Sequence, residues 1–433
     1  MRRVTEPEGA TRRYAGRVPR TGMIALAGLL ALAASASLAV APAASASTSG
    51  TAGAPTALAA VGPQTVPAVA GARTAVSSTP YLPKPTGSHP VGTTFLHLKD
   101  TSRPDPWVPA AKARELMVSL WYPATSPGRR TAPYMTAKES ELLIEDAKLT
   151  GVPPDALSKT RTNAFVDAEP AGRKHSLPLV VLSPGFTEPR SSLTALAEDL
   201  ASQGYVVAGI DHTYESLGTT FPGGRTTTCV ACEVAPKGAE FWSKVGRSRA
   251  ADTSFVLDSL TGPHPKWRSA ALIDASRIAM AGQSAGGAVT IPTMLKDTRV
   301  RAGIDMDGTT FDPIPDSGLS RPFMFLGSQA MHSPGGKDTT WDRDWRQLTG
   351  WRRWLVVTGA EHFSFTDTSL LLEQLGVYRN PGLAGARAVE ITRRYVRAFF
   401  DLHLLKKPQP LLDNPSTTYP ELKLCAPEKK TCK

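Results

Sequence analysis

Short uninterrupted apolar runs, separated by stretches with helical periodicity, dominate the chain from about residue 115 to residue 405. Such runs are typical of strands in a parallel sheet that helices cover on both faces. The predicted strands are 116–122, 177–183, 205–211, 277–282, 302–306, 322–327 and 353–358. The predicted helices are 191–203, 240–260, 285–295, 369–375 and 386–405. The alternation predicts an α/β fold with a doubly wound, mainly parallel sheet, whose functional site lies at the carboxyl ends of strands.

Residues 1–46 have the features of a secretory signal peptide. Six arginines precede an apolar stretch from 23 to about 40, and Ala44-Ser45-Ala46 is a small-residue cleavage pattern. The pair Arg12-Arg13 leaves both the Sec and the twin-arginine export routes open. A retained membrane anchor is the alternative, but the apolar run is short for a bilayer and ends in small residues. We therefore expect a secreted, extracellular protein.

Between the signal peptide and the apolar runs, residues 47–84 are expected to form a disordered spacer. They are mostly Ala, Ser, Thr, Gly, Val and Pro, and such a stretch lacks the large side chains that offset ordering entropy. Residues 85–433 then form one catalytic domain. The segment 135–176 fits the alternation poorly, so we expect an insertion near the sheet edge and a candidate cap over the site.

The formal net charge is +11, and removal of the leader's six arginines and two glutamates would leave +7. No run rich in Lys and Arg with interleaved aromatic residues follows the leader, so nucleic-acid binding is not expected. A basic surface still allows transient contact with a lipid or polymer surface. A monomer is the expected state.

The chain has four cysteines, Cys229, Cys232, Cys425 and Cys432. Secretion makes disulfides the default, and sequence proximity favours Cys229–Cys232 and Cys425–Cys432 among the three pairings. A redox Cys-x-x-Cys motif is the alternative for the first pair, but that motif needs its first cysteine at a helix N-terminus, and this one follows a Gly- and Thr-rich loop. No four ligands have zinc-site spacing, so no metal is expected.

The segment 282–286 has the sequence Gly-Gln-Ser-Ala-Gly and lies between a predicted strand and a predicted helix. This is the G-x-S-x-G pattern in the setting where a serine hydroxyl is held exposed in a strained turn. Ser284 is therefore the predicted nucleophile, at a helix N-terminus that favours developing negative charge.

Acyl transfer by serine also needs a base and an acid, which follow in the chain order Ser, Asp or Glu, His. Asp305 and Asp307 both lie at the end of the strand 302–306, and Asp307 at the tip is the better placed of the two. His362, in a loop after the strand 353–358, is the predicted base. His332 and His212 have weaker support, and His212 is expected to be a wall or structural residue.

The oxyanion hole is predicted from two backbone N–H groups. One belongs to Ala285, directly after the nucleophile. The other belongs to Phe186, because Gly185 gives the turn after the strand 177–183 the freedom to aim that N–H at the site. The alternative for this second segment is an ordinary strand-to-helix turn.

The chain from 115 to 405 resembles the α/β-hydrolase group that includes the plasma-type (isoform II) platelet-activating-factor acetylhydrolases and bacterial secreted relatives. The resemblance rests on these segments: Ser119-Leu120-Trp121-Tyr122-Pro123, Ser183-x-Gly185-Phe186, Arg249-Ala250-Ala251-Asp252, the 282–287 turn, Gly303-Ile304-x-x-Asp307 and Gly359-x-x-His362-x-x-Phe365-x-Asp367. It implies a triad of Ser284, Asp307 and His362, with Phe186 and Ala285 as oxyanion donors. Pro184 and Gln283 depart from the family, which often has histidine at both positions.

These observations predict a serine hydrolase that cleaves carboxylic esters through an acyl-serine intermediate, without metal or organic cofactor. Phospholipids with a short sn-2 acyl chain or other lipid-like esters are the expected substrates. A secreted lipase or cutinase-like polyester hydrolase is the alternative, because it shares the same fold and triad. A catalytically inactive binding protein is the distant alternative.

Overall fold

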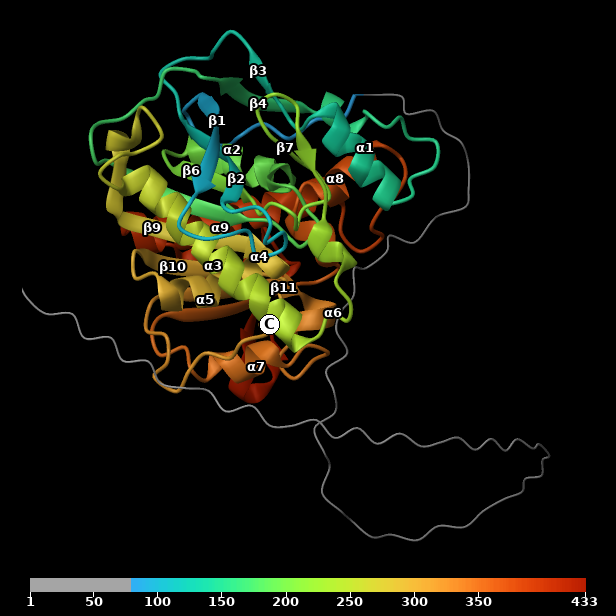
Figure 1. Cartoon of the computed structure of the whole chain (residues 1–433). Helices are drawn as coiled ribbons and strands as arrows, with labels where there is room; N and C mark the ends of the chain where they lie inside the picture. The colour runs from blue at the N-terminus through green and yellow to red at the C-terminus, as the bar shows by residue number, and fades with distance from the viewer. Residues whose placement is uncertain (1–78) are drawn as a thin grey trace, which may run out of the picture. The chain divides into compact units, whose positions relative to one another are not determined.

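The computed structural model describes residues 79–433, drawn in colour in Figure 1. The expected signal peptide, 1–46, and most of the expected spacer, 47–84, lie outside the described residues. Among residues 79–433, no helix combines the length and the apolar character that a membrane span requires.

Twelve strands form one sheet with the order β14-β13-β12-β11-β10-β9-β5-β6-β2-β1-β4-β3. The central strands run parallel, from β6 through β5, β9, β10 and β11 to β12. Their bounds are β5 Leu177–Ser183, β6 Val206–Asp211, β9 Ile273–Gln283, β10 Val300–Met306, β11 Phe323–Ser328 and β12 Arg352–Val357. The chain passes from β5 to β6 on one side and then to β9 on the other side of β5. The carboxyl ends of β5 and β9 therefore flank the switch point where ligands bind in such sheets.

Antiparallel strands extend both edges of this parallel core. Their bounds are β1 Val91–Asp100, β2 Arg114–Pro123, β3 Thr131–Pro133, β4 Arg161–Val166, β13 Leu422–Ala426 and β14 Thr431–Cys432. Only β4 runs parallel to its neighbour β1. A separate hairpin pairs β7 Thr219–Thr220 with β8 Thr226–Thr227.

Helices cover both faces of the sheet (Figure 1). Alternate residues of each central strand join two different apolar clusters, one with α3, α5 and α7 and the other with α2 and α9. Every residue of β5 is buried, as expected for a strand covered on both sides. The helices are α1 Ala137–Asp146, α2 Thr194–Ser202, α3 Ala239–Thr261, α4 Ala285–Ala288, α5 Thr290–Lys296, α6 Gln329–His332, α7 Thr340–Trp345, α8 Thr368–Gln374 and α9 Gly385–Leu405.

The predicted helix 285–295 is divided into α4 and α5 at Val289. Pro292 explains the division, because it has no N–H to donate to the carbonyl of Ala288 one turn earlier. The outer strands β1, β3, β4, β13 and β14 were not predicted. β1 alternates between buried and exposed side chains and so lacks the continuous apolar run that marks the central strands.

The segment 135–176 contributes both a helix and a strand next to the sheet edge. Helix α1 begins with a capping box, in which Thr136 Oγ1 accepts from the Glu139 N–H at 3.2 Å and the Glu139 carboxylate accepts from the Thr136 N–H at 2.8 Å. Strand β4 pairs with β1 at the sheet edge. The segment is thus partly built into the sheet edge, while its role as a cap remains a prediction.

Residues 79–84, expected to belong to the disordered spacer, are packed against the domain. Leu82 is only 3% exposed, and the Tyr81 N–H donates to Gln374 of α8 at 2.8 Å. The Arg393 guanidinium of α9 donates to the carbonyls of Pro83 and Lys84 at 3.0 and 3.1 Å. The predicted boundary at residue 85 is therefore wrong, because buried contacts offset the ordering entropy of this short stretch.

The structure contains two disulfide bonds, Cys229–Cys232 and Cys425–Cys432. The second closes the hairpin of β13 and β14, where these two cysteines are direct cross-strand partners. The first lies in a short turn after β8, and Cys229 is buried in the core.

Candidate active site

Ser284 lies between the end of β9 and the start of α4, with φ 56° and ψ −125°. A non-glycine residue at positive φ carries backbone strain, which the surrounding structure must hold in place. The Ser284 N–H donates to the Met306 carbonyl of β10 at 2.8 Å, and its side chain is partly exposed. The serine is thus presented at the carboxyl end of the central strand.

Both glycines of the motif are required by close backbone contacts. A Cβ on Gly282 would overlap the Gly286 carbonyl oxygen, and a Cβ on Gly286 would overlap the carbonyl oxygen of Ser183. The turn after β5 therefore touches the first turn of α4 directly. This contact fixes the two segments that flank the switch point against each other.

His362 opens the short 3₁₀ helix His362–Phe365, and its Nδ1 lies 2.6 Å from Asp307 Oδ2. Asp307 directly follows β10, and its other oxygen accepts from the Ser328 N–H at 2.6 Å. Burial acts to raise the pKa of Asp307, but His332 and the hydrogen bonds from His362 and Ser328 lower it to about 2. Asp307 is therefore a carboxylate at neutral pH and can orient His362.

Asp305, the alternative acid, points elsewhere. It is fully buried, and one of its oxygens accepts from the Gly308 N–H at 2.9 Å. Burial and the nearby charge of Asp307 hold the pKa of Asp305 well above its usual range, despite that hydrogen bond. It pins the loop after β10, whereas Asp307 contacts the histidine.

The loop that carries His362 is tied to the serine turn. Gln283 Nε2 donates to the His362 carbonyl at 3.0 Å. The Ser284 hydroxyl has no hydrogen-bond partner among residues 79–433, and catalytic hydrogen bonds are often long until substrate is bound. His362 and Asp307 are therefore in direct contact, and the loop of His362 is bonded to the turn that carries Ser284.

The two N–H groups predicted as oxyanion donors, those of Phe186 and Ala285, donate to no other group in the described part of the chain. Phe186 follows β5 through Pro184 and Gly185, and a methyl group on Gly185 would lie 3.4 Å from Ser284 Cβ. The Phe186 ring packs edge-on against Phe241 and Trp242 of α3. Of these two donors without another acceptor, one is in the residue after the serine and the other is in the turn after Gly185.

A buried polar network that was not predicted from sequence lies beneath the Phe186 turn. Ser183 Oγ lies 3.0 Å from His212 Nε2, and His212 Nδ1 lies 2.8 Å from Asp252 Oδ2. Arg249 donates to the Pro184 carbonyl at 2.6 Å and to Glu215 Oε2 at 2.6 Å. His212 is thus a structural residue, as expected.

Arg114 completes this network. It donates to Asp105, to the Thr213 carbonyl and to both oxygens of Asp252, at 2.6 to 3.1 Å. The signal in the sequence was the Arg249-Ala250-Ala251-Asp252 spacing, since residues three apart share one helix face. Arg114 and Glu215 had no comparable signal.

A second histidine, His332, approaches the Asp307 carboxylate. Its Nε2 lies 3.5 Å from Asp307 Oδ1, and its ring stacks on Trp341 at 4.0 Å. Because His332 lies in a segment rich in Gly, Ser and Pro, nothing in the sequence predicted its contact with Asp307. His332, the first histidine after Asp307 in the chain, therefore lies beside the other carboxylate oxygen of Asp307 and does not replace His362.

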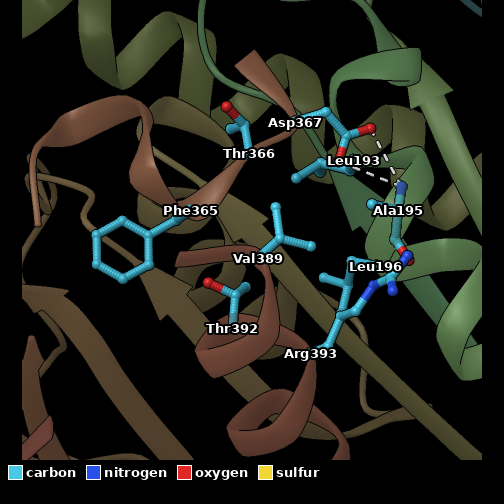
Figure 2. A pocket seen from close by; sticks show the side chains of 9 residues that line it. All are labelled: Leu193, Ala195, Leu196, Phe365, Thr366, Asp367, Val389, Thr392 and Arg393. Carbon is cyan, nitrogen blue, oxygen red and sulfur yellow. Dashed lines mark hydrogen bonds between the residues drawn. The ribbon is translucent and has the colours of Figure 1, made fainter. Parts of the chain in front are cut away.

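A small cavity on the α2 and α9 side contains neither Ser284 nor His362 (Figure 2). Asp367 accepts there from the Ala195 N–H at 3.1 and 3.2 Å, as the dashed lines in Figure 2 mark. Burial, acting against that hydrogen bond, raises the pKa of Asp367 to about 8. This residue anchors the loop after His362 to α2. Residues 79–433 contain no cluster of three or more His, Cys, Asp or Glu side chains suited to a metal ion.

Comparison with known proteins identifies relatives across most of the chain. The family "Platelet-activating factor acetylhydrolase, isoform II" matches residues 74–229 and 268–405. A protein of Arthroderma benhamiae named "Probable 1-alkyl-2-acetylglycerophosphocholine esterase" is 29% identical over 380 residues, 80% of this chain and 94% of that protein. The platelet-activating factor acetylhydrolase of Cavia porcellus is 28% identical over 212 residues, 44% of this chain and 48% of that protein.

A solved structure gives a further match. The ferulic acid esterase from Streptomyces cinnamoneus is 43% identical, with a TM-score of 0.71. The match covers 81% of this chain and all of that one. The predicted α/β-hydrolase fold is confirmed by this neighbour and by the sheet order.

Proposed function

Because the chain belongs to the platelet-activating factor acetylhydrolase, isoform II, family and is a carboxylic ester hydrolase, we propose that Ser284 is its nucleophile. His362 accepts the proton of the Ser284 hydroxyl, while Asp307 holds the imidazole in the tautomer that leaves Nε2 free. The observation that carries the proposal is the 2.6 Å contact of His362 with Asp307 in a loop bonded to the turn of Ser284.

The reaction then has two steps. Attack of Ser284 Oγ on the ester carbonyl places the negative charge on the oxygen between the N–H groups of Phe186 and Ala285. His362 passes its proton to the leaving alcohol, which leaves an acyl-serine. Water, activated by the same histidine, releases the acid. Both donors are backbone groups on packed turns, so they need no reorganisation as the charge develops.

The relatives support two kinds of acyl group. The family and its acetylglycerophosphocholine esterases support esters with short acyl chains, and the ferulic acid esterase supports esters of a small aromatic acid. The substrates are small-molecule or lipid esters. We propose that the acyl group is small in either case, and that the protein acts as a secreted monomer with transient contact to lipid or polymer surfaces. The two disulfides support secretion.

The test is hydrolysis by the mature protein of p-nitrophenyl acetate, methyl ferulate, a 2-acetyl phospholipid, a triglyceride emulsion and a polyester film. Ser284→Ala is expected to lower kcat on every active substrate by about 10⁶-fold, by analogy with other serine hydrolases. A fluorophosphonate probe is expected to label the wild type but not this variant. Equal hydrolysis by the two proteins contradicts the assignment of Ser284.

A further inference from the structure

The side chain of Glu188, whose carboxyl group has no cationic side-chain partner among residues 79–433, lies near Ser284. A methyl group on Gly185 would lie 3.4 Å from Glu188 Cγ and also 3.4 Å from Ser284 Cβ, so the two side chains are neighbours across Gly185. Glu188 is partly exposed, and its one side-chain hydrogen bond is a long one, from Thr368 Oγ1 at 3.4 Å. Between residues 79 and 433, no lysine or arginine forms a salt bridge with it. A carboxylate in this position can pair with a positively charged group of the substrate.

The polar and titratable groups facing Glu188 belong to separate elements. His362 and Thr368 lie in the loop and helix after β12, Asp146 ends α1, and Tyr134 precedes α1. Burial raises the pKa of Glu188 to about 7, with Asp146 also raising it and Thr368 and His362 lowering it. The group therefore changes its charge near neutral pH, and a bound cation would favour the ionised form.

We propose that Glu188 binds a positively charged group on the alcohol part of the ester, such as an alkylammonium. The alcohol part is favoured because His362 gives its proton to the leaving alcohol, and Glu188 lies close enough to interact with the charge of His362. This inference rests on the proposed function of Ser284 and His362. It goes beyond that function by assigning to Glu188 the recognition of a positive charge on the alcohol part of the substrate.

The experiment compares two substrates of the same shape, acetylthiocholine and 3,3-dimethylbutyl thioacetate, which differ in one positive charge. The ratio of their kcat/KM values is measured for the wild type and for Glu188→Gln. Loss of one carboxylate charge beside the cation is expected to lower the ratio about tenfold, mainly through KM. Glu145→Gln is the matched control, because it removes an exposed carboxylate of α1 that is not among the groups acting on the pKa of Glu188, and its ratio is expected to stay within about twofold.

The wild-type ratio is also measured against pH, which tests the inference without any variant. It is expected to rise as pH increases through about 7, where Glu188 ionises. A ratio that is flat with pH, or that Glu188→Gln leaves unchanged, overturns the inference. An equal fall for both substrates also overturns it, because Glu188 would then act on His362 or on folding. Failure of the proposed function gives a distinct result: Ser284→Ala would hydrolyse both thioesters as fast as the wild type.

Discussion

The structure contains two sets of Ser, His and Asp near the same end of the sheet. In the buried set, Ser183, His212 and Asp252 are joined by contacts of 3.0 and 2.8 Å, and each is at most 1% exposed. In the set at the surface, His362 contacts Asp307, but Ser284 has no side-chain partner in the described residues. By hydrogen-bond geometry alone, the buried set is the more complete triad.

This difference shows that contacts among a serine, a histidine and an aspartate are not enough to make the serine a nucleophile. Ser183 ends an ordinary strand, whereas Ser284 is held at positive φ and is partly exposed. Burial and the charge of Arg249 lower the pKa of His212 even though Asp252 opposes them, so this histidine is kept neutral. No substrate reaches the buried set, whose contacts instead hold the turn that carries Phe186.

Replacing each histidine in turn is expected to give the largest difference between the two sets. His362→Ala is expected to lower kcat by about 10⁶-fold, because the proposed base is lost. Its loss of unfolding free energy is expected to be the smaller of the two, because His332 and the Ser328 N–H remain as partners of Asp307. His212→Asn is expected to retain kcat within about 100-fold but to lose stability, since its buried partners become unpaired. Kinetics and denaturant unfolding of both variants measure this. A larger loss of kcat from His212→Asn than from His362→Ala would reverse our assignment.

Arg249→Met sharpens the comparison by removing the cation beneath the Phe186 turn. The variant leaves Glu215 buried without this partner and the Pro184 carbonyl without a donor. Breaking a buried ion pair on one side typically costs about 3–5 kcal/mol of unfolding free energy, and we expect a loss in that range. Arg247→Met, on an exposed position of the same helix, is the control and is expected to change stability by less than about 0.5 kcal/mol. Similar losses from both variants would contradict the role of the network.

The smallest expected effect is the loss of unfolding free energy at acidic pH. The pKa of Asp307 is lowered to about 2 from its usual 3.8, so its ionised form is favoured in the folded state. This contribution is fully present above about pH 4 and is lost as pH falls through 2, and it amounts to about 2 kcal/mol. Unfolding of wild type and Asp307→Asn between pH 2 and 6 measures it. The difference between them is expected to shrink as pH falls, and a constant difference would contradict the pKa.

Sequence reasoning placed residues where a segment carries a local signature, while the catalytic roles of these residues stay predictions. The serine turn, the acid at a strand end and the histidine in a loop each have a short signature, and the order of the three then follows from the fold. It could not place His332 against Asp307 or Glu188 beside Ser284, because these contacts depend on how loops from different strands meet. It also missed the parallel pairing of β4 with β1, since Arg161–Val166 has mixed exposure and its partner lies far away in the chain.

The clamp of Arg393 on Pro83 and Lys84 bears on how this protein can be produced. A recombinant chain starting at residue 85 would keep the buried guanidinium of Arg393 but lose two of the three carbonyls that it binds, along with the pairing of Tyr81 with Gln374. Helix α8, which follows the loop of His362, would thus lose its hydrogen bond with Tyr81. An affinity tag for purification is therefore best joined ahead of Pro80, where the clamp stays whole.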